Sequence, residues 1–269
     1  MGSDDKAKGL TETIVEGAKG LVDDVYKDGA KPTVTVVGET LGATARLLLA
    51  PVNAAIRGLN AVGERLSARV GKKLERVPPE RQLPAPATIA ASAALQYALL
   101  GEGDEVADLR EMFENLLVAS MDRSTTASVH PAFVSMLAQI TPDEAWILKS
   151  ITITPEQSFA LVKAKQIYAN ANDGEYFRER GILCTLGLGI GIDESRQAQY
   201  LTNLARLGLL EMEWIMTVVG VDTEYAELER RIRARPDLRD IKLEIDQGLV
   251  TVTPLGEQFW NTCVHPRTV

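Results

Sequence analysis

The stretch Val36–Gly58, VVGETLGATARLLLAPVNAAIRG, constrains the fold more than any other part of the chain. Drawn as a helix, it has polar side chains within about 20° of one common direction and apolar residues, such as Leu48, over the rest. This narrow polar stripe contains Glu39, Arg46, Asn53 and Arg57. A surface helix normally has a much wider polar face. The stretch is therefore expected either in the centre of a helical bundle or in a bilayer.

Both alternatives stay open. Pro51 cannot donate a hydrogen bond to the carbonyl of Leu47, which predicts a kink or break. In a bundle, the polar stripe would reach solvent or pair with neighbouring helices. In a bilayer, a central charge such as Arg46 costs about 2.5–3.5 kcal/mol, so insertion requires self-association around a water-filled lumen. The candidates for membrane insertion or oligomerisation are Glu39, Arg46, Leu48, Pro51 and Arg57.

A proline-rich segment divides the chain. Residues 77–87, VPPERQLPAPA, contain four prolines in eleven residues and cannot continue a helix. We expect them to link an N-terminal helical segment, residues 1–76, to a helical bundle, residues 88–192. Residues 193–269 are expected to form a third part of α+β type.

Helical patterns dominate the predicted bundle. Thr88–Leu100 is rich in Ala and predicts a short helix. The next helix has apolar residues at helical spacing, which mark its buried face. These residues are Val106, Leu109, Met112, Phe113, Leu116, Leu117 and Met121. His130 and Pro131 begin another helix, and Thr141–Glu144 has the form of a capping box that starts the next one.

The C-terminal part changes character. Its expected elements are a helix ending near Gly208, a strand in Glu211–Val219, a helix over Glu224–Arg235 and a short helix from Pro254. In Ile241–Thr253, apolar and polar residues alternate on both sides of Asp246-Gln247-Gly248. This pattern predicts a β-hairpin. A helix, a hairpin and a last helix are typical of a winged-helix module. The predicted fold class is mainly α, a helical bundle with a C-terminal winged-helix-like α+β part.

Charge and chemistry exclude several classes of function. Residues 1–76 hold 12 Lys and Arg against 10 Asp and Glu, whereas the remainder holds 17 against 27, so most of the chain lacks a basic footprint for nucleic acid. Gly187–Gly191 lacks the third glycine of a dinucleotide-binding loop, and Cys263 and His265 lack a second ligand pair. Glu114 is expected to pair with Arg110 or to be solvated. We therefore expect no catalytic centre, no cofactor and no metal site.

Two motif-bearing stretches resemble a known family. Leu109–Asp122, LREMFENLLVASMD, and His130–Leu148, HPAFVSMLAQITPDEAWIL, resemble the abortive-infection alpha family of bacteria. The residues that carry the resemblance are Phe113, Asn115, Leu116, Leu117, His130, Pro131 and Phe133, with Leu207, Gly208, Gly256 and Phe259 nearer the C-terminus. The resemblance covers about residues 75–265. It implies an intracellular role in defence against phage and supplies no catalytic residues.

These observations favour a non-enzymatic antiphage effector that acts on the inner membrane after it senses infection. In this hypothesis residues 34–76 act on the membrane, and the C-terminal part senses a phage protein or forms a homo-oligomer. The protein would be cytoplasmic until activation brings it to the membrane. The alternative is a winged-helix regulator that contacts a phage protein or nucleic acid. The charge balance argues against nucleic acid.

Overall fold

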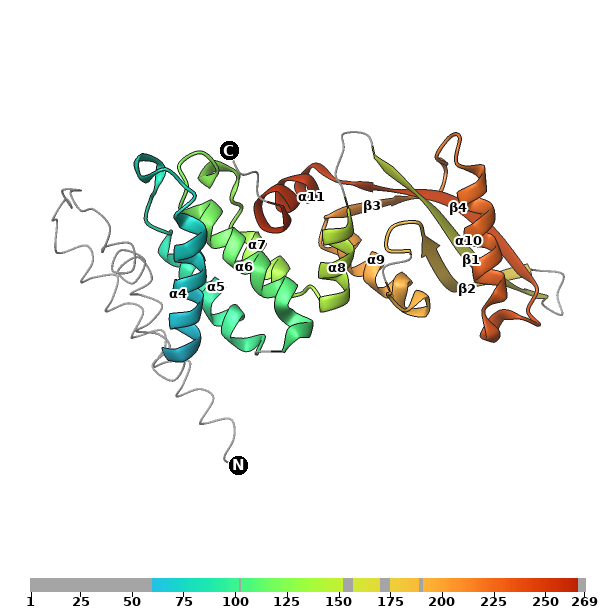
Figure 1. Cartoon of the computed structure of the whole chain (residues 1–269). Helices are drawn as coiled ribbons and strands as arrows, with labels where there is room; N and C mark the ends of the chain where they lie inside the picture. Colours follow the sequence, from blue (N-terminus) through green and yellow to red (C-terminus); the bar gives the residue numbers. More distant parts are fainter. Residues whose placement is uncertain (1–59, 102, 152–156, 170–174, 189–190, 266–269) are drawn as a thin grey trace, which may run out of the picture. The chain divides into compact units, whose positions relative to one another are not determined.

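The computed structural model describes residues 60–101, 103–151, 157–169, 175–188 and 191–265 (Figure 1). The described residues form two compact units. Unit 1 contains residues 60–106 and 110–135, and unit 2 contains residues 107–109 and 136–265. The insertion candidates Glu39, Arg46, Leu48, Pro51 and Arg57 lie outside the described residues.

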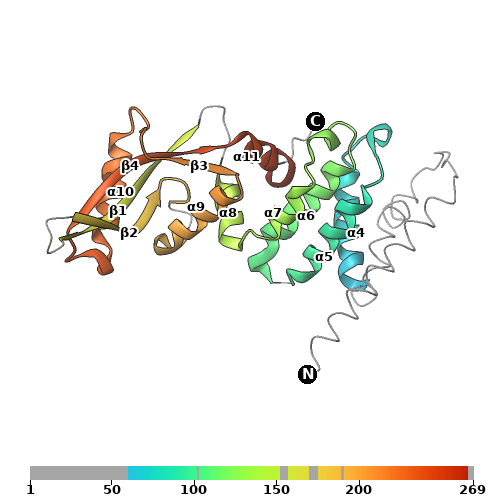
Figure 2. The ribbon, with the colours of Figure 1, turned by 180° about the vertical axis from the view of Figure 1, so that it is seen from behind.

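Unit 1 is helical. Its helices are α4 (Asn60–Leu74), α5 (Ala87–Leu99), most of α6 (Ala107–Ser120) and the first part of α7 (Ala132–Leu137). Figures 1 and 2 show α4 and α5 side by side. In α6 the six consecutive residues Met112–Leu117 are buried, so this helix is covered on nearly every side. The spacing of apolar residues in the sequence correctly predicted the buried positions Phe113, Leu116 and Leu117.

The proline-rich segment packs against the end of α6. It contains a single 3-10 turn, Pro79–Arg81. The Leu83 amide donates to the Met121 carbonyl at 2.7 Å, and the Arg123 amide donates to the Arg81 carbonyl at 2.8 Å. These two bonds join residues 81–83 to residues 121–123 at the end of α6. They fix the middle of the proline-rich segment to the rest of unit 1.

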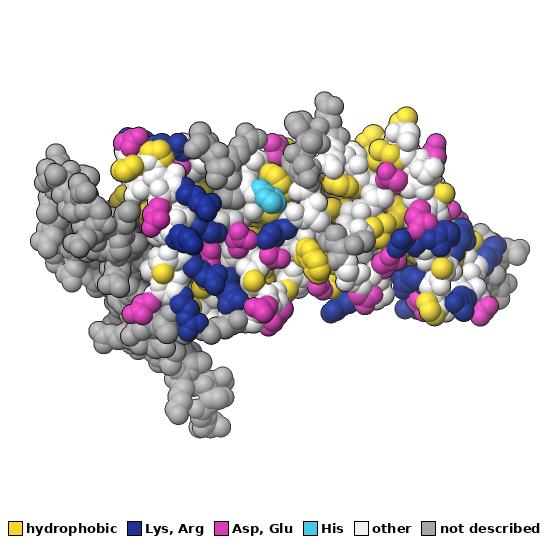
Figure 3. Space-filling model, viewed as in Figure 1, with side chains coloured by type: hydrophobic (Ala, Val, Ile, Leu, Met, Phe, Trp, Pro, Cys, Tyr) yellow, Lys and Arg dark blue, Asp and Glu magenta, His cyan; other side chains and the backbone are white. Residues whose placement is uncertain are grey.

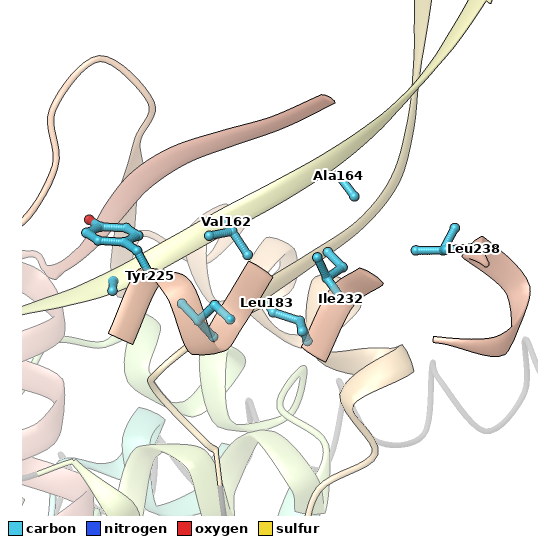
Figure 4. Close-up of a cluster of buried hydrophobic side chains, with 8 residues drawn as sticks. Val162, Ala164, Leu183, Tyr225, Ile232 and Leu238 are labelled. Carbon is cyan, nitrogen blue, oxygen red and sulfur yellow. The ribbon is translucent and has the colours of Figure 1, made fainter. Parts of the chain in front are cut away.

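Unit 2 is built on a four-stranded antiparallel sheet with the order β2-β1-β4-β3. The strands are β1 (Ser158–Ala169), β2 (Glu175–Cys184), β3 (Leu210–Glu213) and β4 (Leu243–Val252). The helices are α8 (Pro142–Ser150), α9 (Gln197–Arg206), α10 (Asp222–Ala234) and α11 (Pro254–Phe259). Helix α10 covers one face of the sheet (Figure 4). There the buried side chains of Tyr225, Leu228 and Ile232 pack against β1 residues such as Val162.

Local sequence signals placed several helix ends correctly. Helix α8 begins at the predicted capping box, where the Glu144 amide donates to Thr141 Oγ1 and the Thr141 amide donates to Glu144 Oε2 at 2.7 Å. Helix α9 ends before Gly208, whose φ of 74° is the left-handed conformation that glycine adopts without strain.

The predicted hairpin in Ile241–Thr253 is wrong. These residues form one strand, β4, which lies between β1 and β3. Gly248 does not make a turn. A Cβ atom at this position would lie 2.3 Å from the Glu213 carbonyl oxygen, so this glycine permits close approach of the neighbouring chain.

The fold class is mixed α+β, so the prediction of a mainly α fold with an α+β part is confirmed only in part. Strands β1 and β2 fall inside residues 88–192, the stretch expected to be a helical bundle. In β1, Ala160, Val162 and Ala164 face α10 and alternate with Lys163 and Lys165, which is the period of a strand. The winged-helix outline is not confirmed, because the sheet takes two strands from before α9 and the predicted hairpin is absent from β4.

Shortening two buried side chains of α6 tests how much they stabilise unit 1. Phe113 and Leu116 are 0% exposed, so Phe113→Ala and Leu116→Ala each remove burial and leave a cavity. Each variant is expected to lower the free energy of unfolding by about 2–5 kcal/mol, measured by denaturant titration. A variant that unfolds like the parent but loses function would show instead that the residue belongs to a binding surface.

Candidate functional site

The main candidate site is the cationic face of α4 and the residues that follow it. Five cations lie within residues 65–76, where Glu75 is the single acid. They are Arg65, Arg69, Lys72, Lys73 and Arg76. The opposite face of the helix is buried through Leu66, Val70 and Leu74, which recur every four residues. Figure 3 shows the Lys and Arg side chains as a column along α4.

A buried carboxylate fixes this face. Glu114 of α6 is 3% exposed. Its Oε1 lies 3.3 Å from Arg69 Nη1 and accepts from the Tyr97 hydroxyl at 3.2 Å, and its Oε2 lies 3.1 Å from Lys73 Nζ. Lys73 also donates to Asn115 Oδ1 at 2.7 Å. Because a buried charge costs several kcal/mol unless it is paired, these contacts stabilise one rotation of α4 against α6.

The pKa of Tyr97 is shifted by its position next to this carboxylate. Burial, together with the nearby charge of Glu114, raises the pKa of Tyr97 to about 12. The tyrosine therefore stays protonated at neutral pH and remains a hydrogen-bond donor to Glu114.

Three cations are exposed and make no contact with Glu114: Arg65 and Lys72 of α4, and Arg76 just after it. Arg69 is also exposed, but its guanidinium and the Lys73 ammonium reach the buried Glu114. An outward row of cations on a rigid helix can bind a polyanionic surface, such as anionic lipid headgroups.

A second ion pair ties the proline-rich segment to unit 1. Arg81 donates to both carboxylate oxygens of Asp122, at 3.1 Å and 2.6 Å, and Asp122 Oδ1 accepts from the Ser124 amide at 2.8 Å. Burial raises the pKa of Asp122, but the hydrogen bonds from Arg81 and Ser124 outweigh burial and bring the pKa below its usual value. This cluster has a structural role.

The family-motif residues do not gather into one site. Phe133 and Phe259 are fully buried, and Leu207 is buried near the end of α9. His130 and Pro131 are exposed, and His130 Nδ1 accepts from the Ala132 amide at 3.1 Å, which caps the start of α7. A Cβ atom at Gly256 would lie 2.1 Å from the Leu209 carbonyl oxygen, so that glycine permits close packing.

The described residues offer few groups for chemistry. Among them, no group of three His, Cys, Asp or Glu could hold a metal ion. Cys184 and Cys263 are fully buried, and burial raises the pKa of both thiols, to about 12 for Cys184. Both thiols are therefore protonated at neutral pH and poor nucleophiles. No helix in the described residues is long and apolar enough to span a membrane.

Sequence reasoning missed the role of Glu114. It pairs with Arg69 and Lys73, rather than being solvated or paired with Arg110 as expected. Glu114 lies among the buried residues Met112–Leu117 of α6, and a buried acid needs a cationic partner. Its position between apolar residues was the feature of the sequence that could have indicated this pairing. Its partners could not be found by local patterns, because they lie more than 40 residues earlier in the chain.

The Arg81–Asp122 pair makes stability depend on pH. The pKa of Asp122 is lowered in the folded state, so its stabilising effect is present above the usual carboxyl pKa and is lost as pH falls through the folded-state pKa. Asp122→Asn should lower the free energy of unfolding at neutral pH by about 1.5–3 kcal/mol, with a smaller difference in acid. Denaturant unfolding between pH 7 and pH 3 measures this, with the exposed Asp240→Asn as control. A difference that does not change with pH would contradict the assignment.

Residues 59–263 match the family described as abortive infection alpha, a span that begins one residue before α4 and ends beyond α11. Neither the curated proteins nor the solved structures contain a significant match. Because the family match covers well over half of the chain, including the motif residues of α6 and α7, the chain belongs to the abortive infection alpha family.

Proposed function

We propose that the protein is an antiphage effector of abortive infection that acts on the inner membrane. The family to which it belongs points to abortive-infection defence. The membrane step rests on one observation, the cationic face of α4, which follows directly after the apolar stretch Val36–Gly58 in the sequence. An apolar segment with cations beside it is typical of chains that attach to anionic membranes.

The charge of α4 is suited to the membrane surface. A Lys or Arg near an anionic bilayer contributes about 1 kcal/mol of attraction. Arg65, Lys72 and Arg76 are exposed, and Arg69 and Lys73 can keep their pairs with Glu114 when these side chains meet the headgroups. Their aliphatic stems can lie along the headgroups while the charged ends stay in water.

Stable attachment normally needs two signals. A polybasic patch alone binds reversibly, and a second apolar element makes the attachment durable. In this proposal the patch is α4 and the apolar element is Val36–Gly58. Self-association of the chain would then shield Arg46 from lipid.

The proposal includes no catalytic step and no cofactor. Damage to the membrane would itself halt the infected cell. A phage protein is the proposed trigger of insertion, and before it appears the exposed cations would hold the protein only reversibly at the membrane surface.

A second candidate function is that of a binding module that contacts a phage protein. One observation favours it: an apolar loop that follows β3 in unit 2 exposes Ile215 and Val219 almost completely. The two functions are compatible if unit 2 senses infection and residues 34–76 act on the membrane.

Charge reversal on α4 tests the membrane step. The variant Arg65→Glu/Lys72→Glu/Arg76→Glu should bind vesicles of 30% phosphatidylglycerol in phosphatidylcholine at least tenfold more weakly than the parent, because three attractions of about 1 kcal/mol become repulsions. Vesicle co-sedimentation at low and physiological salt measures the difference.

The matched control reverses three exposed arginines of unit 2, Arg230, Arg233 and Arg239. This control should bind vesicles like the parent. If the two triple variants lose binding equally, the effect is one of net charge and α4 is not the membrane site. If the parent does not bind anionic vesicles, the membrane step is excluded.

A further inference from the structure

The loop between β3 and α10 carries an exposed apolar patch. Ile215 is 95% exposed, Met216 is 55% exposed and Val219 is 94% exposed. We call these three residues the apolar knob. Single exposed apolar residues are common, but three large ones within five positions of one loop are typical of a binding surface.

A buried tyrosine holds this loop to the sheet. The Tyr225 hydroxyl accepts from the Val218 amide at 2.9 Å and donates to the Gly248 carbonyl at 2.7 Å. Tyr225 is 3% exposed and belongs to the cluster between α10 and the sheet (Figure 4). One buried side chain therefore fastens the loop to β4 between the exposed residues Met216 and Val219.

A tryptophan fixes the other end of the loop. Trp214 lies so close to Gly248 that a Cβ atom there would be 2.9 Å from its ring. Lys163 Nζ lies 3.9 Å from the centre of the same ring, and Lys163 also pairs with Asp246 at 3.8 Å. Because the loop is held at Trp214 and at Val218, the apolar knob is already shaped for binding and loses little conformational entropy when a partner covers it.

Acids flank the apolar knob on both sides. Glu211 and Glu213 precede it in β3, and Asp222 and Glu224 follow it in the first turn of α10. Residues 207–229 contain no Lys or Arg. None of these four acids makes an ion pair within the described part of the chain. The surrounding negative charge repels anionic lipid and nucleic acid and favours a protein with a basic surface.

We infer that the apolar knob binds a segment of a partner protein in which apolar side chains are flanked by Lys and Arg. Apolar contacts would supply the affinity, and pairing of these basic side chains with the four acids would orient the partner and speed association. A symmetric contact between two copies is disfavoured, because it would bring the acids of both knobs together. The inference does not depend on the membrane step, since it uses residues of unit 2 alone.

Selection from a random peptide library tests the chemistry of the partner. Peptides of 12 residues displayed on yeast are selected for binding to the full-length protein. The enriched peptides should combine Lys or Arg with apolar residues. They should bind the variant Ile215→Ser/Val219→Ser at least tenfold more weakly than the parent. Binding should also weaken with added salt and with Glu211→Lys.

The control removes two exposed apolar side chains of α5, in the variant Leu95→Ser/Leu99→Ser, and should bind the peptides like the parent. The inference is overturned if no peptide is enriched, if the enriched peptides are not basic, or if they bind the knob variant as tightly as the parent. A dimer seen by light scattering that Ile215→Ser/Val219→Ser dissociates would overturn it too, by assigning the knob to a second copy of the chain.

Discussion

The buried carboxylate of Glu114 decides which face of α4 meets the solvent. Its partners Arg69 and Lys73 lie on α4, and Tyr97 lies on α5, so one side chain of α6 joins three helices. A carboxyl group at 3% exposure is tolerated only with such partners. With Arg69 and Lys73 directed toward α6, the exposed cations are left in one row, and this row is the surface on which the proposed membrane step depends.

Unit 2 depends on close approach of backbones rather than on a buried charge. Gly248 lets the turn after β3 lie against β4, and Gly256 lets α11 lie against the Leu209 carbonyl. The buried side chain of Gln197 bonds the backbone at Cys184 and Leu186, which ties α9 to the end of β2. The same closely packed framework supports the Trp214 ring and the Tyr225 hydroxyl, and through them the exposed apolar knob.

Features that depend on local chemistry could be predicted from the sequence, and features that depend on distant partners could not. The capping box at Thr141, the end of α9 at Gly208 and the buried face of α6 each follow from neighbouring residues. The prediction failed for β4, where Asp246-Gln247-Gly248 looks like a turn but pairs along its length with β1, more than 80 residues earlier. It also failed for the partners of Glu114, which lie in another helix. The candidates for membrane insertion in Val36–Gly58, such as Arg46, lie outside the described residues and stay predictions.

We propose that the protein protects a bacterial population by acting on the membrane of the infected cell. The most direct test follows membrane potential with a voltage-sensitive dye through a single round of infection. Cells with the parent protein are expected to depolarise before progeny phage are released. Cells with Arg46→Leu at matched soluble expression should depolarise at a different time or not at all. If the parent protects the culture while infected cells keep their membrane potential until lysis, the membrane account is contradicted.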